Sequence, residues 1–546
     1  MALARPEQPP PQASWWGWGD PERVPTLPAG VRQLLVESLG VREPVPVERS
    51  LIDFILPASR LDSDADAELV SALGAENVLI DDEVRLRHTR GKSTPDLLRM
   101  RVCDADDAPD LVLLPGSHAE VLEVLRICSY RRIAVVPFGG GTSVVGGLQP
   151  RADDYSGVVA VDLRRMNALL ELDEESRLAV LEPGLRGPEA EALLRARGYT
   201  LGHFPQSFEY ATLGGFAAAR SSGQASAGYG RFDELVVALR LATPRGTIDL
   251  GRAPKSAAGP DLRQLFLGSE GALGVITSLT VQVRPTPAVC VYEGWRLPSF
   301  REGTEAVRKL AQDGPVPTVL RLSDEAETAL NLARPAAIGQ SSQSAGCLAI
   351  VGFEGTADDV AARRAGAAEV LRAAGGTIDA SAGETWAAQR YDGPYLRDAL
   401  LDTGALVETL ETATFWSSLD RLYQAVSTAL RESLSALGTP PAILCHISHV
   451  YRAGASLYFT VGCAQLDDPL AQWYHAKEAA SDAILSAGGS ISHHHGVGTD
   501  HLRWFSQEIG ELGMAVLRAA KAELDPAGIL NPGILITDRE PPLSIG

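Results

Sequence analysis

A run of apolar residues that ends in three glycines constrains this chain more than any other feature. Residues 133–138 read Ile-Ala-Val-Val-Pro-Phe, which is typical of a buried strand. Glycines 139–141 follow at once, and Thr142 and Ser143 come after them. Glycine lets a backbone approach a ligand closely, and successive backbone N–H groups in such a turn form a concave anion site, to which the two hydroxyls add donors. The turn therefore predicts a bound phosphate or pyrophosphate.

Two familiar phosphate-binding motifs are excluded at this turn. No Gly-Lys-Ser/Thr follows the glycines, so the turn is not a Walker loop. The G-x-G-x-x-G spacing of the Rossmann fingerprint is also absent. On this stretch alone, a glycine-rich turn without a ligand remains the alternative, because short motifs also occur by chance.

The segments around the turn predict alternating strands and helices. Residues 111–115 are apolar, and Ser117 with Glu120 three residues later predicts a capping box on a helix that leads to the glycine-rich turn. Residues 203–230 are rich in glycine, alanine and serine, which suits close approach to a flat, extended ligand. Other expected elements are strands within 157–185, a helix over 187–198, a hairpin over 234–250, a strand within 266–285 and helices over 468–486 and 505–524.

Length and charge narrow the class of protein. The chain has 546 residues, which is too long for one ordinary domain and predicts two or three. Its formal net charge of −20 argues against nucleic-acid binding and against attraction to anionic membrane surfaces. An anionic small molecule in a locally basic pocket remains compatible with that charge. The pattern changes after Pro287, where a second domain is expected.

Targeting and crosslinking signals are not visible in the sequence. The six cysteines are scattered without a C-x-x-C pair, so no disulfide or zinc framework is predicted. Residues 1–13 do not form a signal-peptide pattern, and no apolar run of about 18 residues predicts a membrane span. The terminal Leu-Ser-Ile-Gly is not a peroxisomal signal. We expect a cytoplasmic enzyme.

Three tryptophans, Trp15, Trp16 and Trp18, form a dense aromatic cluster near the start of the chain. Aromatic rings at this density normally bury a large apolar area. We therefore favour an N-terminal arm packed on the body over a membrane or partner contact. Residues 29–94 are expected to be helical with polar breaks, on the spacing of apolar residues such as Leu34 and Leu51.

Several stretches together resemble the vanillyl-alcohol-oxidase, or PCMH-type, superfamily of FAD-binding flavoproteins. These stretches are PFGGGTS at 137–143, the small-residue segment 203–230, SEGALGVIT at 269–277 and DPAGILNPG at 525–533. The resemblance implies an α+β fold, in which a bipartite FAD-binding domain of two α/β subdomains cradles FAD. An α+β cap domain with an antiparallel sheet is then expected over the flavin ring. The implied division is 1–100 for an N-terminal arm and helical region, 101–288 for the FAD-binding domain, 289–504 for the cap domain with its histidine loop, and 505–546 for a segment that returns to the FAD-binding domain.

Within this superfamily, the chain resembles the alkyldihydroxyacetonephosphate synthases. The matching stretches are WWGWGD at 15–20, HTRGKSTPDLLRMR at 88–101, RLSDEAE at 321–327, GASLYFT at 454–460 and SHHHGVG at 492–498. The resemblance implies a transferase of ether-lipid synthesis that exchanges the acyl chain of acyl-dihydroxyacetone phosphate for a long-chain alcohol, through a flavin N5 adduct and without net oxidation. It also implies lipid-like substrates, a homodimer and peripheral contact with the inner face of a membrane.

The resemblance assigns FAD contacts residue by residue. These are Pro137, Gly139, Gly140, Gly141, Thr142, Ser143, Pro205, Gln206, Ser207, Tyr210, Ala211, Ser221, Ser222, Glu270, Gly271, Gly274, Val275 and Ile276, with Arg321 in the flavin environment. Non-covalent binding is expected, because Gly141 and Thr142 stand where some members carry the histidine that attaches the flavin. Gln206 is a departure, since an acidic residue is expected there, and Thr499-Asp500 replaces a basic stretch.

The same resemblance implies the catalytic residues. Tyr458 matches the family's catalytic tyrosine, and a phenol needs nearby positive charge to act as a base. His493, His494 and His495 match its triple histidine, with His494 expected to transfer a proton or to contact phosphate. Arg397 matches an arginine that is suited to gripping a carboxylate or phosphate with two hydrogen bonds.

Each of these assignments has a simpler alternative. Tyr458 could be a packed core tyrosine, and Arg397 an ordinary surface partner of Asp398 or Asp402. The adjacent histidines could be a metal site. No metal is expected, because in an extended segment only the first and third share a face, and no Cys, Asp or Glu cluster with metal-ligand spacing accompanies them.

Two rival functions remain at this point. One is an FAD-dependent oxidoreductase of the D-2-hydroxyacid (D-lactate or glycolate) dehydrogenase type on the same fold. The other is a catalytically silent lipid-binding protein that keeps FAD as a structural part. The triple histidine and the GASLYFT stretch favour the synthase interpretation over the oxidoreductase, and a Tyr458→Phe substitution without functional effect would favour the silent protein.

Overall fold

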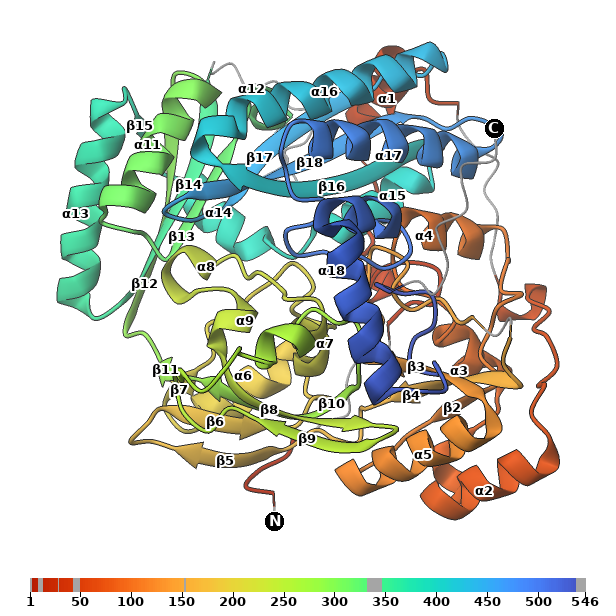
Figure 1. Ribbon diagram of the computed structural model, residues 1–546. Coiled ribbons are helices and arrows are strands. Elements are labelled where there is room, and N and C mark those ends of the chain that lie inside the picture. Colours follow the sequence, from red (N-terminus) through yellow and green to blue (C-terminus); the bar gives the residue numbers. More distant parts are fainter. Residues whose placement is uncertain are drawn as a thin grey trace.

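The computed structural model describes residues 2–7, 13–27, 29–42, 50–151, 154–330 and 346–536 (Figure 1). Within these residues, sheets of four, five and seven strands form the framework of the protein. The two smaller sheets lie below the seven-stranded sheet in Figure 1, so the expected arrangement of two α/β parts and a separate antiparallel sheet is observed. The terminal Leu-Ser-Ile-Gly lies outside the described residues.

The four-stranded sheet carries the glycine-rich turn. Its order is β1-β2-β4-β3, for strands β1 (Val78–Leu79), β2 (Leu111–Leu113), β4 (Gly157–Asp162) and β3 (Ile133–Phe138). The last three run parallel, and α5 (His118–Arg131) connects β2 to β3 with Val121, Val124 and Leu125 fully buried. The predicted strand and helix are confirmed. The capping box is only half formed, because Glu120 accepts a hydrogen bond from Gly116 N (2.7 Å) rather than from Ser117 N.

The five-stranded sheet is antiparallel and forms the second layer of the lower part. Its order is β5-β6-β10-β8-β9, for β5 (Leu169–Asp173), β6 (Leu178–Leu181), β10 (Val275–Gln282), β8 (Val236–Thr243) and β9 (Gly246–Leu250). The predicted hairpin is β8–β9, with its turn at Pro244 and Arg245. The helices α6 (Gly187–Arg195), α7 (Leu213–Ala218) and α9 (Phe232–Leu235) pack on this sheet and share its apolar core. A short pair, β7 (Tyr199–Thr200) and β11 (Arg284–Pro285), lies beside it.

The seven-stranded sheet is antiparallel and takes all its strands from residues 289–464. Its order is β15-β12-β14-β13-β17-β18-β16, for β15 (Thr377–Asp379), β12 (Val289–Leu297), β14 (Cys347–Gly355), β13 (Val319–Ser323), β17 (Ala442–Val450), β18 (Gly454–Ala464) and β16 (Ala405–Phe415). Four helices pack on one face: α11 (Phe300–Asp313), α13 (Ala357–Ala373), α16 (Leu419–Ala436) and α17 (Pro469–Ser486). Because side chains alternate along a strand, Leu457 and Phe459 enter that core while Tyr458 points to the opposite face.

The C-terminal segment returns to the glycine-rich turn, as expected. The helix α18 (Leu502–Leu524), kinked at Gly510, leads to a parallel bridge between Leu530 and Val135 of β3. Asn531 donates from its side chain to Gly147 O and Glu270 O, which ties three distant segments together. The division of the chain at residues 100, 288 and 504 stays a prediction.

The N-terminal arm is packed on the body, as favoured from the sequence. The Trp15 ring lies 4.9 Å from Phe54, and the Trp18 ring lies 6.1 Å from Tyr210. The helical expectation was wrong around Leu51, where only a 3₁₀ turn, Leu51–Asp53, forms before extended backbone. The side chain of Leu34 lies outside what the structure describes.

The remaining helices are short connectors or cover the edges of the sheets. They are α1 (Ala29–Leu39), α2 (Ser63–Leu73), α3 (Asp82–Arg87), α4 (Thr94–Arg101), α8 (Ser226–Tyr229), α10 (Arg263–Phe266), α12 (Glu325–Ala329), α14 (Ala382–Gln389) and α15 (Gly393–Leu401). Of these, α14 and α15 matter most for function, because they line the cavity described next.

Candidate active site

A cavity of about 410 Å³ lies between the glycine-rich turn and the open face of the seven-stranded sheet. Its volume is in the range of ligand pockets. It brings together nearly all the residues selected from the sequence. Those that line it are Pro137, Gly139, Gly140, Gly141, Thr142, Ser143, Pro205, Gln206, Ser207, Ala211, Ser221, Ser222, Glu270, Gly271, Gly274, Val275, Ile276, Arg321, Arg397, Tyr458, His494 and His495.

Two selected residues do not line this cavity. Tyr210 is turned away from it, because its ring packs on Trp18 and its hydroxyl bonds Tyr395 Oη (3.1 Å). His493 lies behind His494 and contacts it through the ring nitrogens. Both support residues that do line the cavity, and neither is placed to touch a ligand within it.

The glycine-rich turn is packed too tightly to carry side chains. A Cβ atom on Gly140 would lie 2.0 Å from Tyr210 O, and Gly141 has a φ of +67° that favours glycine. Ser143 Oγ accepts a hydrogen bond from Gly147 N (3.1 Å), which closes the loop. The backbone of the turn therefore forms one wall of the cavity, as the sequence predicts for an anion cradle.

A buried carboxylate joins the turn side of the cavity to the histidine loop. Glu270 accepts hydrogen bonds from Val497 N (2.9 Å) and Gly498 N (3.1 Å). Burial raises the pKa of Glu270 to about 7, although these two backbone donors oppose the shift. Glu270 therefore fixes the loop that follows the three histidines.

A second carboxylate, Glu411 of β16, holds the three histidines themselves. Its side chain accepts hydrogen bonds from the backbone N–H of His493 (2.8 Å), His494 (3.0 Å) and His495 (2.9 Å), and from Ser492 Oγ (2.8 Å). Burial alone would raise the pKa of Glu411, but the adjacent histidines, His494 first, hold it well below its usual value. Glu411 is thus a fixed buried anion that shapes the loop.

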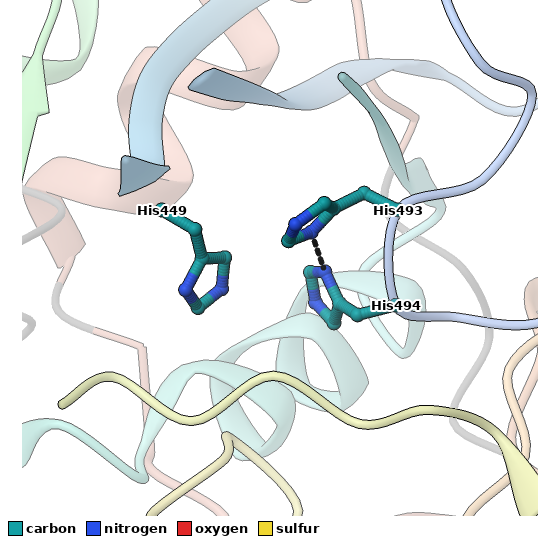
Figure 2. A group of neighbouring side chains, drawn as sticks. All are labelled: His449, His493 and His494. Atoms are coloured by element: carbon teal, nitrogen blue, oxygen red, sulfur yellow. Dashed lines mark hydrogen bonds between the residues drawn. The ribbon is translucent and has the colours of Figure 1, made fainter. Parts of the chain in front are cut away.

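The histidine cluster also includes His449, which lies on strand β17 and not in the loop that carries the three adjacent histidines. The rings of His449, His493 and His494 converge (Figure 2), and their nitrogens lie within 4.8 Å of one another. His493 Nδ1 bonds His494 Nδ1 (3.0 Å), and His493 Nε2 bonds Tyr451 Oη (2.7 Å). A hydrogen-bonded chain therefore runs from the cavity, at His494, to Tyr451.

These imidazoles have partners that hold them as a hydrogen-bonded group. His449 Nδ1 bonds Ser226 Oγ (2.8 Å) and Ser222 Oγ (3.1 Å). Burial lowers the pKa of both His449 and His493 well below the usual value, so both rings are neutral near pH 7. Neutral imidazoles can also bind a metal ion. Within the described residues, His449, His493 and His494 are the cluster of side chains that could act as metal ligands. The absence of a metal stays a prediction.

Tyr458 lies opposite Glu411 in the β16–β18 pair, with its ring against the histidines. Its ring centroid is 5.7 Å from that of His495 and 4.9 Å from that of His446. Burial raises the pKa of Tyr458, and the opposing effects of Thr409 and Arg397 do not reverse the shift. The phenol is therefore protonated near neutral pH, and it suits proton donation.

His446 was not selected from the sequence, yet it lines the cavity beside Tyr458. Its Nδ1 bonds Glu327 Oε2 (3.0 Å) and lies 3.2 Å from Arg321 Nη2. Arg321 also forms an ion pair with Glu327. These contacts orient the His446 ring, and the role of Arg321 in the flavin environment stays a prediction.

Arg397 of α15 is buried, so it does not form the surface ion pair with Asp398 or Asp402 that was the simpler alternative. It is 9% exposed, and its Nη1 donates to Lys92 O (2.9 Å). Nε and Nη2 are buried without a hydrogen-bond partner, and the nearest carboxylate, that of Asp398, is 3.8 Å from Nε. A buried guanidinium on a cavity wall, with two nitrogens that make no hydrogen bond, is suited to binding an anionic group.

The family of the chain follows from comparison with known proteins. Residues 109–250 match a family model described as an FAD binding domain, and residues 286–535 match one described as the C-terminal domain of FAD linked oxidases. An alkyldihydroxyacetonephosphate synthase of Dictyostelium discoideum is 33% identical, over 96% of this chain and 93% of that protein. The chain belongs to the alkyldihydroxyacetonephosphate synthase family.

Other comparisons agree with this family. A solved alkyldihydroxyacetonephosphate synthase structure is 30% identical and superposes with a TM-score of 0.81, over 95% of this chain and 98% of that one. A mitochondrial D-lactate dehydrogenase (cytochrome) of Arabidopsis thaliana is 28% identical, over 79% of this chain and 74% of that protein. The fold expected from the sequence is confirmed.

FAD is the cofactor of this family, and the cavity fits it. The glycine-rich turn offers bare backbone for a pyrophosphate, and the cavity extends from it to Arg397, Tyr458 and His494. Gln206 Nε2 and Arg321 Nε are buried without hydrogen-bond partners in residues that line the cavity, as expected where a polar ligand belongs. The turn and residues 205–211 would hold FAD, while its individual contacts stay predictions.

Sequence reasoning missed several residues around the site. These are His446, His449, Tyr451, Glu327 and Glu411. A weak signal existed for the first two, since two histidines interrupt the otherwise strand-like run Cys445–Val450. No local pattern marks Glu411, because its partners come from a loop more than 80 residues later.

Proposed function

We propose that this protein exchanges the acyl chain of an acyl-dihydroxyacetone phosphate for a long-chain alcohol, as an alkyldihydroxyacetonephosphate synthase. The observation that carries the proposal is the convergence of Arg397, Tyr458 and His494 on one FAD cavity. When bound, FAD supplies an electrophilic ring system. Binding, orientation and proton transfer fall to the side chains of the protein.

Arg397 is suited to the anionic groups of this reaction. The substrate carries a phosphate, and a fatty acid leaves as a carboxylate. Two of the guanidinium nitrogens of Arg397 are unpaired and buried, so an anion that reaches them makes charge-assisted hydrogen bonds in a site shielded from water.

Tyr458 and His494 divide the proton transfers in this proposal. The buried phenol of Tyr458 stays protonated and donates, because burial raises its pKa. His494 accepts a proton from the bound substrate, and the chain through His493 to Tyr451 provides a route for that proton to leave the cavity.

The apolar chains of the substrates need an apolar wall. Leu396, Leu400 and Val407 line the cavity beside Arg397, and Trp18 of the N-terminal arm completes this side. An acyl or alkyl chain that lies here buries apolar surface from water, which favours lipid substrates over small hydroxy acids.

The test uses the holoenzyme under anaerobic conditions with palmitoyl-dihydroxyacetone phosphate and labelled hexadecanol. We expect labelled ether product, released palmitate and no net reduction of the flavin, and we expect Tyr458→Phe to lose the ether product while it retains FAD. Flavin bleaching by D-lactate or glycolate, without ether product, would identify a D-2-hydroxyacid dehydrogenase instead.

The assembly and attachment of the protein are further parts of the proposal. We propose a non-covalent FAD, a homodimer and peripheral contact with the inner face of a membrane, since both substrates carry long chains. No helix within the described residues has the length and apolarity to cross a bilayer. Release of FAD on acid precipitation, light scattering and liposome flotation test these three points in turn.

A further inference from the structure

A second arginine shares the cavity with Arg397. Arg390 lies between α14 (Ala382–Gln389) and α15 (Gly393–Leu401), and it lines the cavity together with Gly393 and Pro394 of the first turn of α15. The link between these helices therefore presents two guanidinium groups to one space.

The charge of Arg390 is not neutralised by the protein. Its Nε and Nη1 are buried without a hydrogen-bond partner. Other arginines nearby form ion pairs with carboxylates, as Arg321 does with Glu327 and Arg23 with Glu209. The ion pairs formed among the described residues do not include Arg390. Arg390 is partly buried, and a cation that loses contact with water and gains no counter-charge is unfavourable unless a ligand supplies one.

Aromatic rings fix the position of this free cation. The guanidinium carbon of Arg390 lies 5.0 Å from the ring centroids of Phe204 and Tyr391, and 6.0 Å from that of Trp386. Such contacts hold a guanidinium in place without removing its charge. The arginine is thus preorganised to receive an anion.

Further unsatisfied polar groups lie around Arg390. Gln206 Nε2, Gln224 Oε1 and Gln389 Oε1 are buried without partners, and all three residues line the cavity. Gln224 Nε2 donates to Arg390 O (3.1 Å), which joins this side chain to the same corner. Of these three groups, the amide nitrogen of Gln206 can donate to a phosphate oxygen, whereas the two glutamine oxygens are acceptors and need a donor from the ligand.

The two arginines act on different surroundings. Arg397 is among the charges that lower the pKa of Tyr458 and of His495, so its guanidinium lies near the groups proposed to move protons. Arg390 instead packs against the rings of Phe204, Trp386 and Tyr391, none of which is among the groups proposed to move protons. One cation is therefore near the reacting atoms and the other is set apart from them.

We propose that Arg390, in the link between α14 and α15, forms a subsite for the phosphate monoester of the substrate, while Arg397 holds the carboxylate that leaves. This inference rests on the proposed function. The phosphate stays on the substrate throughout the exchange, so its cation belongs away from the reacting carbon.

The first test uses the wild-type holoenzyme and two simple anions, inorganic phosphate and palmitate. Their inhibition of ether formation is measured singly and together. Separate subsites predict that both anions bind at once, so that their inhibitory effects multiply. Mutually exclusive binding would overturn the assignment of two subsites.

The second test compares Arg390→Gln, Arg390→Met and Arg390→Lys with a control, Arg301→Gln, whose side chain is 83% exposed. Loss of a charge-assisted contact predicts a KM for the acyl substrate and a phosphate Ki that both rise by about 10- to 100-fold in the Gln and Met variants, with kcat within about threefold. The KM and phosphate Ki of the Lys variant should lie between those of the wild type and the Gln and Met variants, because lysine keeps the charge but lacks the paired N–H donors of the guanidinium. FAD content should be unchanged.

The outcomes separate the inference from the function on which it rests. If Arg390→Met binds FAD and keeps the wild-type KM and phosphate Ki, Arg390 only packs against its aromatic neighbours and the subsite is refuted. If the wild-type enzyme makes no ether product, the proposed function fails first. Flavin-absorbance titration with inorganic phosphate, in wild-type and Arg397→Gln proteins, then still shows whether the Arg390 corner binds phosphate.

Discussion

Glu411→Gln is the substitution that most directly tests how the histidine loop is held. Glutamine keeps the size of the side chain and one acceptor oxygen, but it removes the negative charge. It also places an amide N–H₂ group toward backbone donors that the carboxylate now satisfies. The Glu411 side chain is buried, so solvent cannot replace what is lost.

The magnitude follows from the donors that meet this carboxylate. Three backbone N–H groups and the hydroxyl of Ser492 donate to it. A hydrogen bond to a charged acceptor contributes about 1 kcal/mol more than a neutral one, so four donors give a cost of about 4 kcal/mol. At about 1.4 kcal/mol for each factor of ten, the ordered loop becomes up to ~10³-fold less populated. We expect kcat/KM to fall by about 10²- to 10³-fold.

The assay combines ether-product kinetics with hydrogen exchange of the loop amides. Exchange at residues 493–495 should accelerate in Glu411→Gln, while exchange in the distant strand β3 stays as in the wild type. Glu408→Gln is the matched control on the same strand, because the Glu408 carboxylate accepts from Trp473 Nε1 and does not touch the loop. Wild-type protection at 493–495 together with wild-type kcat/KM in Glu411→Gln would refute the reasoning.

Three further predictions concern the proton chain, acid stability and metal content. Tyr451→Phe removes the hydroxyl that lies 2.7 Å from His493 Nε2, so we expect kcat to fall about tenfold and its pH profile to change. Tyr130→Phe, at an exposed tyrosine, is the control and should leave kcat and its pH profile unchanged. Burial lowers the pKa of His203 and His495 to about 3, so between pH 6.5 and 3 the unfolded chain binds protons that the folded protein does not. Each histidine should therefore lower stability by up to about 1.4 kcal/mol per unit as the pH falls below about 6.5. Glu270 opposes this, because its pKa of about 7 lets the folded protein hold a proton that the unfolded chain releases, but the buried histidines, which include His449 and His493, outnumber it. A melting temperature that stays constant from pH 7 to 5 would contradict the prediction. Chelator treatment should leave activity and melting temperature unchanged, and stoichiometric metal by elemental analysis would disprove the expectation of no metal.

Much of the architecture could be predicted because it is encoded in short patterns. The strand Ile133–Phe138 and the glycine-rich turn after it are local features, and so is the hairpin β8–β9. The helix α17 also agrees with its predicted bounds to within a residue. The expectation failed around Leu51, because Leu51 and Phe54 pack against the cluster around Trp15 while Ile52 and Ile55 are 88% and 89% exposed, so the apolar residues do not share one buried helical face.

The candidate site also has features that could be predicted from the sequence and features that could not. Residues that resemble family motifs, such as Arg397 and Tyr458, could be named from the sequence. The protonation of Tyr458 and the pairing of Arg397 could not be predicted in this way. Burial decides that the Tyr458 phenol stays protonated and that Arg397 has no surface partner. Free energies of burial depend on the whole fold and not on neighbours in the chain.

By itself, the sequence determined the glycine cradle, the order of strands and helices around it, and the identity of the groups that can carry the chemistry. Only the tertiary structure decided their arrangement. Strand register sets Glu411 opposite Tyr458, and chain crossing brings His449 to the histidine loop. It also leaves two guanidinium nitrogens of Arg390 without a hydrogen-bond partner among the residues that the structure describes. The physical reason is that pairing between buried polar groups depends on contacts between distant segments, and local periodicity carries no record of such contacts.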